Sequence, residues 1–255
     1  MKWCELLLEI SLILSIALTF LPLVYRGNAL KLLEILLSIS LFSAIVARGF
    51  EVKRFPVVNL YESLIFLAWG LSLVTIIFSK NFLEIEHILL NLLIFIIIGV
   101  STLLPPWEKA PHYLIPALKS YWLYFHVTTS FLSYSGFFAA AILGFLYLIT
   151  ERKERKKLFD KLSYQITSIS FLLLSTGILT GAVWAHYAWG RYWSWDPKET
   201  WSLITWIIYA GYLHARITRG WGGKKSAIWL LAGFLATLFT FLGVNYLLPG
   251  LHSYL

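Results

Sequence analysis

The sequence predicts an all-α membrane protein, a polytopic bundle of about eight transmembrane helices with an external tryptophan-rich loop. Three observations point to this fold. The chain is 59% hydrophobic and only 13% charged, whereas soluble domains carry about a quarter charged residues. Its mean hydropathy is +0.74. Its apolar residues fall in successive runs about as long as a bilayer-crossing helix. Soluble catalytic folds are therefore excluded, and we expect residues 1–255 to form a single integral membrane domain.

Eight spans are predicted in order along the chain, separated by short polar or proline-containing segments. They cover residues 6–25, 28–47, 59–79, 84–104, 121–150, 163–184, 197–217 and 226–247. The first 23 residues are apolar, but no small-residue cleavage site follows them. We therefore expect a retained first helix rather than a signal peptide.

The charge run at residues 151–161 sets the orientation. It holds six Lys and Arg residues, so the positive-inside rule places it in the cytoplasm. Alternation then puts 13 of the 21 Lys and Arg residues inside and the tryptophan-rich segment outside. Three basic residues, Arg48, Lys53 and Arg54, fall on the outer side. Either they have a role there, or the first two helices are miscounted.

Charge and cysteine content exclude further classes. The formal net charge is +8, but most basic residues flank apolar spans, where lipid headgroups and topology account for them, so we expect no nucleic acid partner. Cys4 is the only cysteine, which excludes an intrachain disulfide, a CxxC redox pair and any cysteine-based zinc or iron–sulfur site. Any thiol chemistry therefore belongs to a partner.

Tryptophan is concentrated in one segment. Six of the twelve tryptophans lie within residues 184–206, which form the external loop of the predicted topology. An aromatic belt at the lipid headgroups is one explanation, because tryptophan and tyrosine favour this depth. We favour another. The alternate spacing of Trp193 and Trp195, with Gly190 allowing close backbone approach, describes a flat aromatic shelf for a large planar ligand.

The end of this segment also has the pattern of a helix start. Asp196 fits an N-cap, Pro197 the first helical position and Glu199 the third. We therefore interpret both carboxylates as capping groups rather than as general acids or bases. Asn59 and Glu62 repeat the pattern at the start of the third predicted span, where we again expect a cap.

Two of the six histidines share the outer layer with the tryptophans. His126 lies about two turns into the fifth predicted span from its outer end, and His252 follows the last span on the outer side. His214 lies 17 residues after Pro197, about 26 Å further along the helix, too far to ligate a metal at the shelf. A polar residue at this depth either bonds a neighbouring helix or has a function, and we favour function.

The other histidines carry weaker signals. His186 lies within the tryptophan-rich segment and is either a third outer ligand or, as we favour, a residue at the rim. His112 and His87 are interpreted as solvated residues in or beside loops.

Two imidazoles beside an aromatic shelf suit haem. Imidazole binds haem iron axially and tryptophans cover the porphyrin faces, whereas zinc calls for a tighter cluster with carboxylate or thiolate ligands. Outer basic residues then have a candidate role, because guanidinium groups pair with carboxylates such as haem propionates. Ordinary solvated loop charge is the alternative. The residues concerned are Arg48, Lys53, Arg54, Arg191 and Lys198.

One long run and four shorter segments form a recognisable set. The run Trp189-Gly-Arg-Tyr-Trp-Ser-Trp-Asp-Pro-Lys-Glu-Thr-Trp-Ser-Leu-Ile-Thr-Trp206 is similar to the WWD signature of haem-handling proteins. Further matches lie at residues 55–64, 116–126, 212–216 and 243–252. In this form the set resembles the CcsA (ResC) family of System II cytochrome c biogenesis proteins, over most of the chain beyond Phe55.

The resemblance implies an external haem b held against the WWD loop at about residues 184–206, with His126 and His252 as axial ligands. The residues expected around it are Trp189, Trp193, Trp195, Trp201, Arg191 and Asp196. It also implies a second haem within the membrane, with His214 as one ligand and a histidine of the partner CcsB (ResB) as the other. Within this chain, His87 is the alternative second ligand.

The implied activity is haem delivery. Members of the family pass haem to the Cys-x-x-Cys-His motif of an apocytochrome c, where thioethers form outside the cytoplasm. We expect a multi-pass protein of the bacterial plasma membrane or the thylakoid membrane that acts in a haem-attachment complex. No nucleophile or acid–base pair is evident, and positioning haem beside two thiols can suffice. Whether this chain alone is an enzyme stays open.

Three other interpretations stay open. CcmC, the WWD protein of System I, is similar in length, but it is expected to have six spans and to lack the Asp-Pro-Lys-Glu-Thr form of the loop. A membrane b-type cytochrome that only moves electrons would favour paired histidines at matched depth. A transporter of another amphipathic solute would purify without bound haem.

Overall fold

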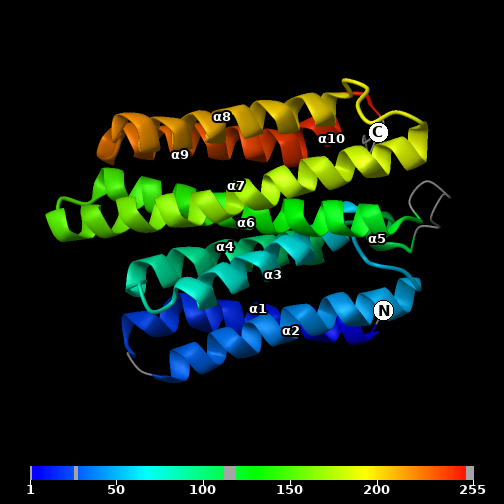
Figure 1. The fold of residues 1–255 in the computed structure, drawn as a ribbon. Helices are drawn as coiled ribbons and strands as arrows, with labels where there is room; N and C mark the ends of the chain where they lie inside the picture. The colour runs from blue at the N-terminus through cyan, green and yellow to red at the C-terminus, as the bar shows by residue number, and fades with distance from the viewer. Residues whose placement is uncertain (1, 26–27, 112–118, 251–255) are drawn as a thin grey trace. The chain divides into compact units, whose positions relative to one another are not determined.

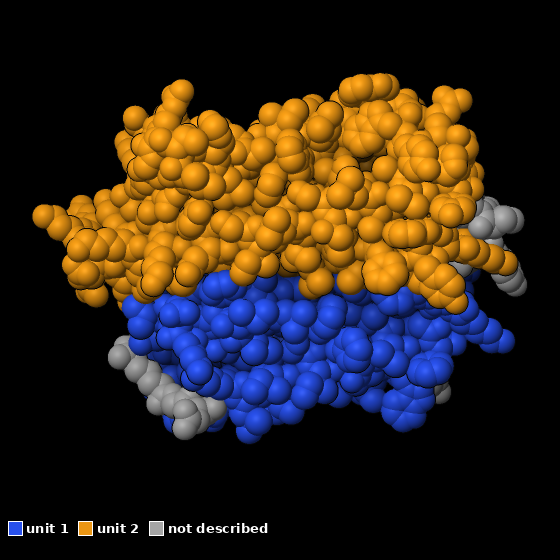
Figure 2. Space-filling view, viewed as in Figure 1, with its two compact units in different colours: residues 1–113 blue, residues 114–255 orange. Residues whose placement is uncertain are grey.

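The computed structural model describes residues 2–25, 28–111 and 119–250, and this part of the chain is helical with no strand. It divides into two compact units, residues 1–113 and residues 114–255, which are described separately (Figures 1 and 2). The all-α fold class predicted from the apolar runs is confirmed. The expectation of a single membrane domain stays a prediction, because the two units are each described by themselves.

The first unit is a bundle of four long helices. They are α1 (Lys2–Phe20), α2 (Asn28–Val52), α3 (Leu60–Phe78) and α4 (Glu84–Leu103), with the short elements η1 (Leu21–Leu23) and α5 (Pro106–Lys109). Helix α1 packs on α2 and α4, and α3 packs on the same two helices. The side chains between them are fully buried and mostly aliphatic, and include Leu8, Leu37, Leu67, Leu71, Leu90 and Ile94.

The second unit is built on the pair α6 (Tyr121–Ile149) and α7 (Lys153–Trp189), which pack along their length. It continues with α8 (Pro197–Arg219), α9 (Gly223–Leu238), the π-helical turn η3 (Phe239–Gly243) and α10 (Val244–Leu247). Helix α9 packs on both α6 and α8. Small residues allow α6 and α7 to approach closely, because a Cβ on Gly136 would overlap the side chain of Ser170.

Eight helical segments in the described part are long enough to cross a membrane, as predicted. Seven of them are also sufficiently apolar, with α9, η3 and α10 forming one continuous segment. Helix α8 has 23 residues but is the most polar, because it carries charged residues at both ends and a histidine between them. In a membrane such residues face protein, water or a ligand.

Two helices are longer than predicted. The charge run at residues 151–161 was expected to be a loop, but α7 begins at Lys153 and continues to Trp189. Lysine, arginine and glutamate are good helix formers, so charge alone does not end a helix. With 37 residues, α7 is about 55 Å long, well beyond the ~30 Å of a bilayer core. Helix α2 likewise extends to Val52.

Candidate functional site

The tryptophan-rich segment is mostly helical, and its loop is short. Helix α7 includes Trp189, and α8 begins at Pro197, which leaves residues 190–196 between them. Figure 1 shows this loop at the same end of the second unit as the start of α6 and as α10. Gly190 caps the end of α7, with a left-handed φ of 76° and an N–H that donates to the His186 carbonyl at 2.9 Å.

The start of α8 confirms the predicted cap. The Asp196 side chain accepts a hydrogen bond from the Lys198 N–H at 3.0 Å, and Glu199 accepts from the Asp196 N–H at 3.2 Å. Glu199 also accepts from the Ser194 N–H at 2.8 Å. These bonds fix the loop to the first turn of the helix, so both carboxylates have the structural role predicted for them.

Trp195 is held in a strained and exposed conformation. Its φ is +60° and 69% of its surface is exposed. A bulky residue in the left-handed region costs about 1–2 kcal/mol, which the bonds on either side of it must offset. Backbone strain of this kind concentrates at functional sites.

The expectation of one flat aromatic shelf is wrong. The Trp193 and Trp195 rings lie 5.8 Å apart and are nearly perpendicular, at 87°. The Trp184 and Trp189 rings are inclined at 64°. The expectation assumed strand-like alternation, which the left-handed backbone at Trp195 interrupts. These indoles therefore present faces and edges in different directions.

The other two predicted haem contacts differ in exposure. Trp201 lies on the first turns of α8, where its ring packs 4.2 Å from the ring of Phe239 in the π-helical turn. Its carbonyl accepts a hydrogen bond from Thr240 at 3.1 Å. Arg191, in the loop, is exposed. Trp201 thus connects the loop region to the bundle, whereas Arg191 is at the surface.

His126 is oriented by α7. Its Nδ1 lies 2.7 Å from the carbonyl oxygen of Gly177, so Nδ1 carries the hydrogen and donates it, which assigns the lone pair to Nε2. The imidazole is stacked at 14° to the Trp184 ring, with centroids 6.2 Å apart. Gly181 makes room for it, because a Cβ there would lie 2.5 Å from Nδ1.

The last described residues of the chain contact the same loop and the start of α8. The Lys198 ammonium donates to the Asn245 side chain at 2.5 Å, which joins the start of α8 to α10. Gly250 lies against Asp196 and Pro197, since a Cβ on it would be 2.6 Å from the Asp196 carboxylate. His252 lies outside the described residues. Lys198, which we considered for a haem propionate, thus has a protein partner.

The remaining histidines separate clearly. His186 is exposed and stacks on Tyr192 with centroids 4.3 Å apart, as expected of a residue at the rim. His214 is exposed on α8. His87 is not simply solvated as expected, because its Nδ1 lies 2.5 Å from the buried carboxylate of Glu34. His112 lies outside the described residues.

Two of the outer arginines have a partner that the sequence did not reveal. Arg48 and Arg54 both bond the buried carboxylate of Glu62, at 3.1 and 2.7 Å. Arg48 also donates to the Lys109 carbonyl at 2.6 Å. With side chains only 3% and 4% exposed, neither is available to a haem propionate, so that expectation is wrong for them. Glu62 is therefore an ion-pair centre as well as part of a cap.

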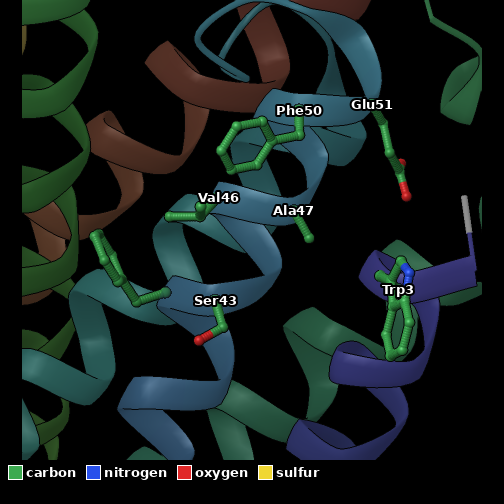
Figure 3. Close-up of a pocket in the computed structure, with 7 residues that line it drawn as sticks. Trp3, Ser43, Val46, Ala47, Phe50 and Glu51 are labelled. Atoms are coloured by element: carbon green, nitrogen blue, oxygen red, sulfur yellow. The ribbon is translucent and has the colours of Figure 1, made fainter.

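An open hollow of about 690 Å³ lies in the first unit beside α1 and α2 (Figure 3). Its lining is apolar and aromatic apart from Ser43 and Glu51 and contains no histidine. It therefore lacks an axial ligand for haem. Among the described residues, no group of three His, Cys, Asp or Glu side chains could hold a metal ion.

The chain is similar to proteins of cytochrome c assembly. Residues 57–252 match the family described as Cytochrome C assembly protein. Cytochrome c biogenesis protein CcsA of Guillardia theta is 40% identical over 86% of this chain and 83% of its own length. The CcsA of Chlamydomonas reinhardtii is 40% identical over 96% of this chain and 71% of its own length.

A solved structure has a similar fold. Cytochrome c Heme Lyase CcmF superposes with a TM-score of 0.76 at 19% sequence identity, over 94% of this chain. The chain spans 46% of that protein's length, so the likeness concerns the helical fold of one part of it.

Proposed function

The chain belongs to the cytochrome c assembly protein family, and on that premise we propose that it holds haem b at the outer face of a membrane and presents it to apocytochrome c. Its general role is haem handling in cytochrome c biogenesis. In the attachment step, each cysteine S–H of the Cys-x-x-Cys-His motif adds across a haem vinyl group to form a thioether. This chain's contribution is to bind and orient the haem.

The observation that carries the proposal is the state of His126. Histidines that ligate metals donate the hydrogen of the other ring nitrogen to a carbonyl or carboxylate, which fixes tautomer and orientation. His126 has this arrangement, because Nδ1 donates to Gly177 and the lone pair is on Nε2. The neighbouring Trp184 supplies an apolar wall. His126 and its neighbours therefore suit the role of an axial haem ligand and its surroundings.

The opposite ligand proposed is His252. Gly250, two residues before it in the chain, lies against Asp196 in the tryptophan-rich loop. Trp189, Trp193 and Trp195 contact the haem in this proposal, while Asp196 shapes the loop. Arg191, an exposed cation in the loop, pairs with a haem propionate in this proposal. Trp201 acts at the inner margin of the site.

A second haem is proposed at His214, with the other axial ligand from CcsB. The exposure of His214 supports a ligand that comes from outside this chain. His87 is the less suitable alternative, because its side chain is only 19% exposed and is therefore less accessible than the exposed His214. The proposed location is the bacterial plasma membrane or the thylakoid membrane, with the tryptophan-rich loop away from the cytoplasm.

The experiment is a cytochrome c maturation assay with cavity variants. His126→Gly and His252→Gly should each abolish maturation, and added imidazole should restore part of it by filling the vacant ligand position. His186→Gly is the matched control, since this exposed imidazole stacks on Tyr192 at the rim, and it should retain maturation. Normal maturation in both His126→Gly and His252→Gly would contradict the proposal.

A further inference from the structure

The rotation of α8 is fixed near its inner end, where His214 lies. Two residues after it, Arg216 bonds Asp160 of α7 at 2.7 Å and Ser226 of α9 at 3.3 Å. Asp160 also accepts from the Gly223 N–H at 2.9 Å. Residues two apart on a helix point in nearly opposite directions. Because Arg216 is held inward, His214 is held outward.

A tryptophan of α9 covers the same face of α8. Gly211 precedes His214 by three residues, so the two are neighbours on the helix surface. A Cβ on Gly211 would lie 2.9 Å from the six-membered ring of Trp229. The Trp229 indole N–H donates to the Ile208 carbonyl at 2.9 Å. This bond and the missing Cβ hold the Trp229 ring one turn from His214.

A second tryptophan follows at the end of α8. Gly220 adopts a left-handed φ of 60°, and the Trp221 N–H donates back to the Ala215 carbonyl at 3.2 Å. The left-handed glycine and this bond fold the chain back over the last turn of the helix. The Trp221 and Trp229 rings then lie 5.6 Å apart at 64°. The ammonium of Lys225 sits 5.1 Å from the Trp221 ring.

These groups combine three chemistries at one end of a helix: an exposed imidazole, two adjoining indoles and an exposed cation beyond them. An outward-facing histidine in a membrane span is costly without a partner. The complementary ligand is a planar apolar body with a metal at its centre and carboxylates at the edge nearest the aqueous phase. Haem has this form.

We propose that Trp221, Trp229 and Lys225 form the wall and the carboxylate-binding edge of the haem site at His214. The inference rests on the proposed function, which assigns His214 as a haem ligand, and adds the residues that enclose that haem. The indoles cover apolar porphyrin surface, and the Lys225 ammonium pairs with a propionate at the inner boundary of the membrane. An interfacial aromatic belt that binds lipid alone is the competing explanation.

The test uses the purified complex of this chain with its CcsB partner, with haem as the probe. Second-haem content, the haem dissociation constant and the midpoint potential are measured for Trp229→Leu and Lys225→Gln. Trp107→Leu and Lys157→Gln are the matched controls, because these side chains are 70% and 76% exposed and belong to other helices, α5 and α7. Trp229→Phe tests whether an aromatic ring alone rescues binding.

Trp229→Leu should weaken binding of the second haem about threefold to tenfold, the range for one aromatic contact, and Trp229→Phe should restore most of it. Lys225→Gln should lower the midpoint potential, because a cation near the propionates favours the reduced haem. Both controls should match the unaltered complex. His214→Gly should remove the second haem.

The outcomes separate the two proposals. If His214→Gly loses the second haem while Trp229→Leu and Lys225→Gln leave its affinity and potential unchanged, the tryptophans are a lipid belt and this inference is wrong. If His214→Gly leaves the second haem intact, the assignment of His214 in the proposed function fails instead. If Trp229→Leu does not fold, Trp229→Phe and Lys225→Gln still decide the question through affinity and potential.

Discussion

The His126 imidazole donates a hydrogen bond to the Gly177 carbonyl of the facing helix, over 2.7 Å. The bond joins a side chain of α6 to a backbone carbonyl of α7. It also selects the imidazole tautomer that can bind a metal through Nε2. One turn further along α7, Gly181 provides the space that the ring occupies. The orientation of the proposed ligand therefore depends on the packing of these two helices.

Gly181→Ala should displace His126 and weaken external haem binding about tenfold or more, as loss of a residue that orients a metal ligand usually does. The added Cβ would lie 2.5 Å from Nδ1, so the ring must move. Gly99→Ala is the matched control, because a Cβ there meets nothing within 4 Å. Titration of haem into the two purified variants measures the difference, and equal affinities would refute the orienting role.

Trp195→Gly should lower haem occupancy while costing little thermal stability. Glycine relieves the left-handed strain at this position, worth about 1–2 kcal/mol, so thermal stability should fall less than in Trp193→Gly. Haem occupancy should nevertheless fall, since the exposed indole is lost. Thermal unfolding and a haem assay on the same samples check both parts. Unchanged occupancy in Trp195→Gly would remove this indole from the site.

Asp196→Ala should lower the free energy of unfolding by about 1 kcal/mol through loss of the helix cap. Asp196→Asn retains an oxygen for the Lys198 N–H and should lose little stability. Denaturation of the two variants in detergent distinguishes the cap from the charge. If Asn proved as harmful as Ala, the carboxylate charge rather than the capping bond would be what this position requires.

Glu62→Gln should be severely destabilising, by about 3–5 kcal/mol, because it removes the carboxylate that pairs with the buried Arg54 and one of the two that pair with Arg48. The Glu62 side chain is fully buried between Arg48 and Arg54. Glu154→Gln, on a side chain that is 86% exposed, is the control and should change stability little. The midpoint of thermal unfolding measures both, and similar midpoints would show that this ion pair contributes little.

Much of the fold could be predicted from the apolar runs, because a span must satisfy its backbone internally and keep a minimum length. The cap at Asp196 and Glu199 could also be predicted, since it depends only on local sequence. The helix ends at charged or aromatic stretches could not be predicted in this way, because the residues at 153–161 and 184–189 favour helix as readily as loop.

The missed features are tertiary. Arg48 lies 14 residues from Glu62, and nothing in the local pattern links them. The flat shelf failed because one left-handed residue, Trp195, reverses the assumed alternation. Trp221 and Trp229 lie outside the dense tryptophan cluster, and the local sequence does not indicate that they pack together. A glycine three residues before His214 was the available signal, since it marks close approach of another side chain.

The most direct test is the visible absorption spectrum of the purified complex with CcsB, recorded for the unaltered chain and for His126→Gly before and after addition of imidazole. The account predicts a low-spin haem spectrum in the unaltered complex, loss of the external haem's share in His126→Gly, and recovery of that share when imidazole occupies the vacant position. A His126→Gly spectrum identical to that of the unaltered complex would contradict His126 as the axial ligand.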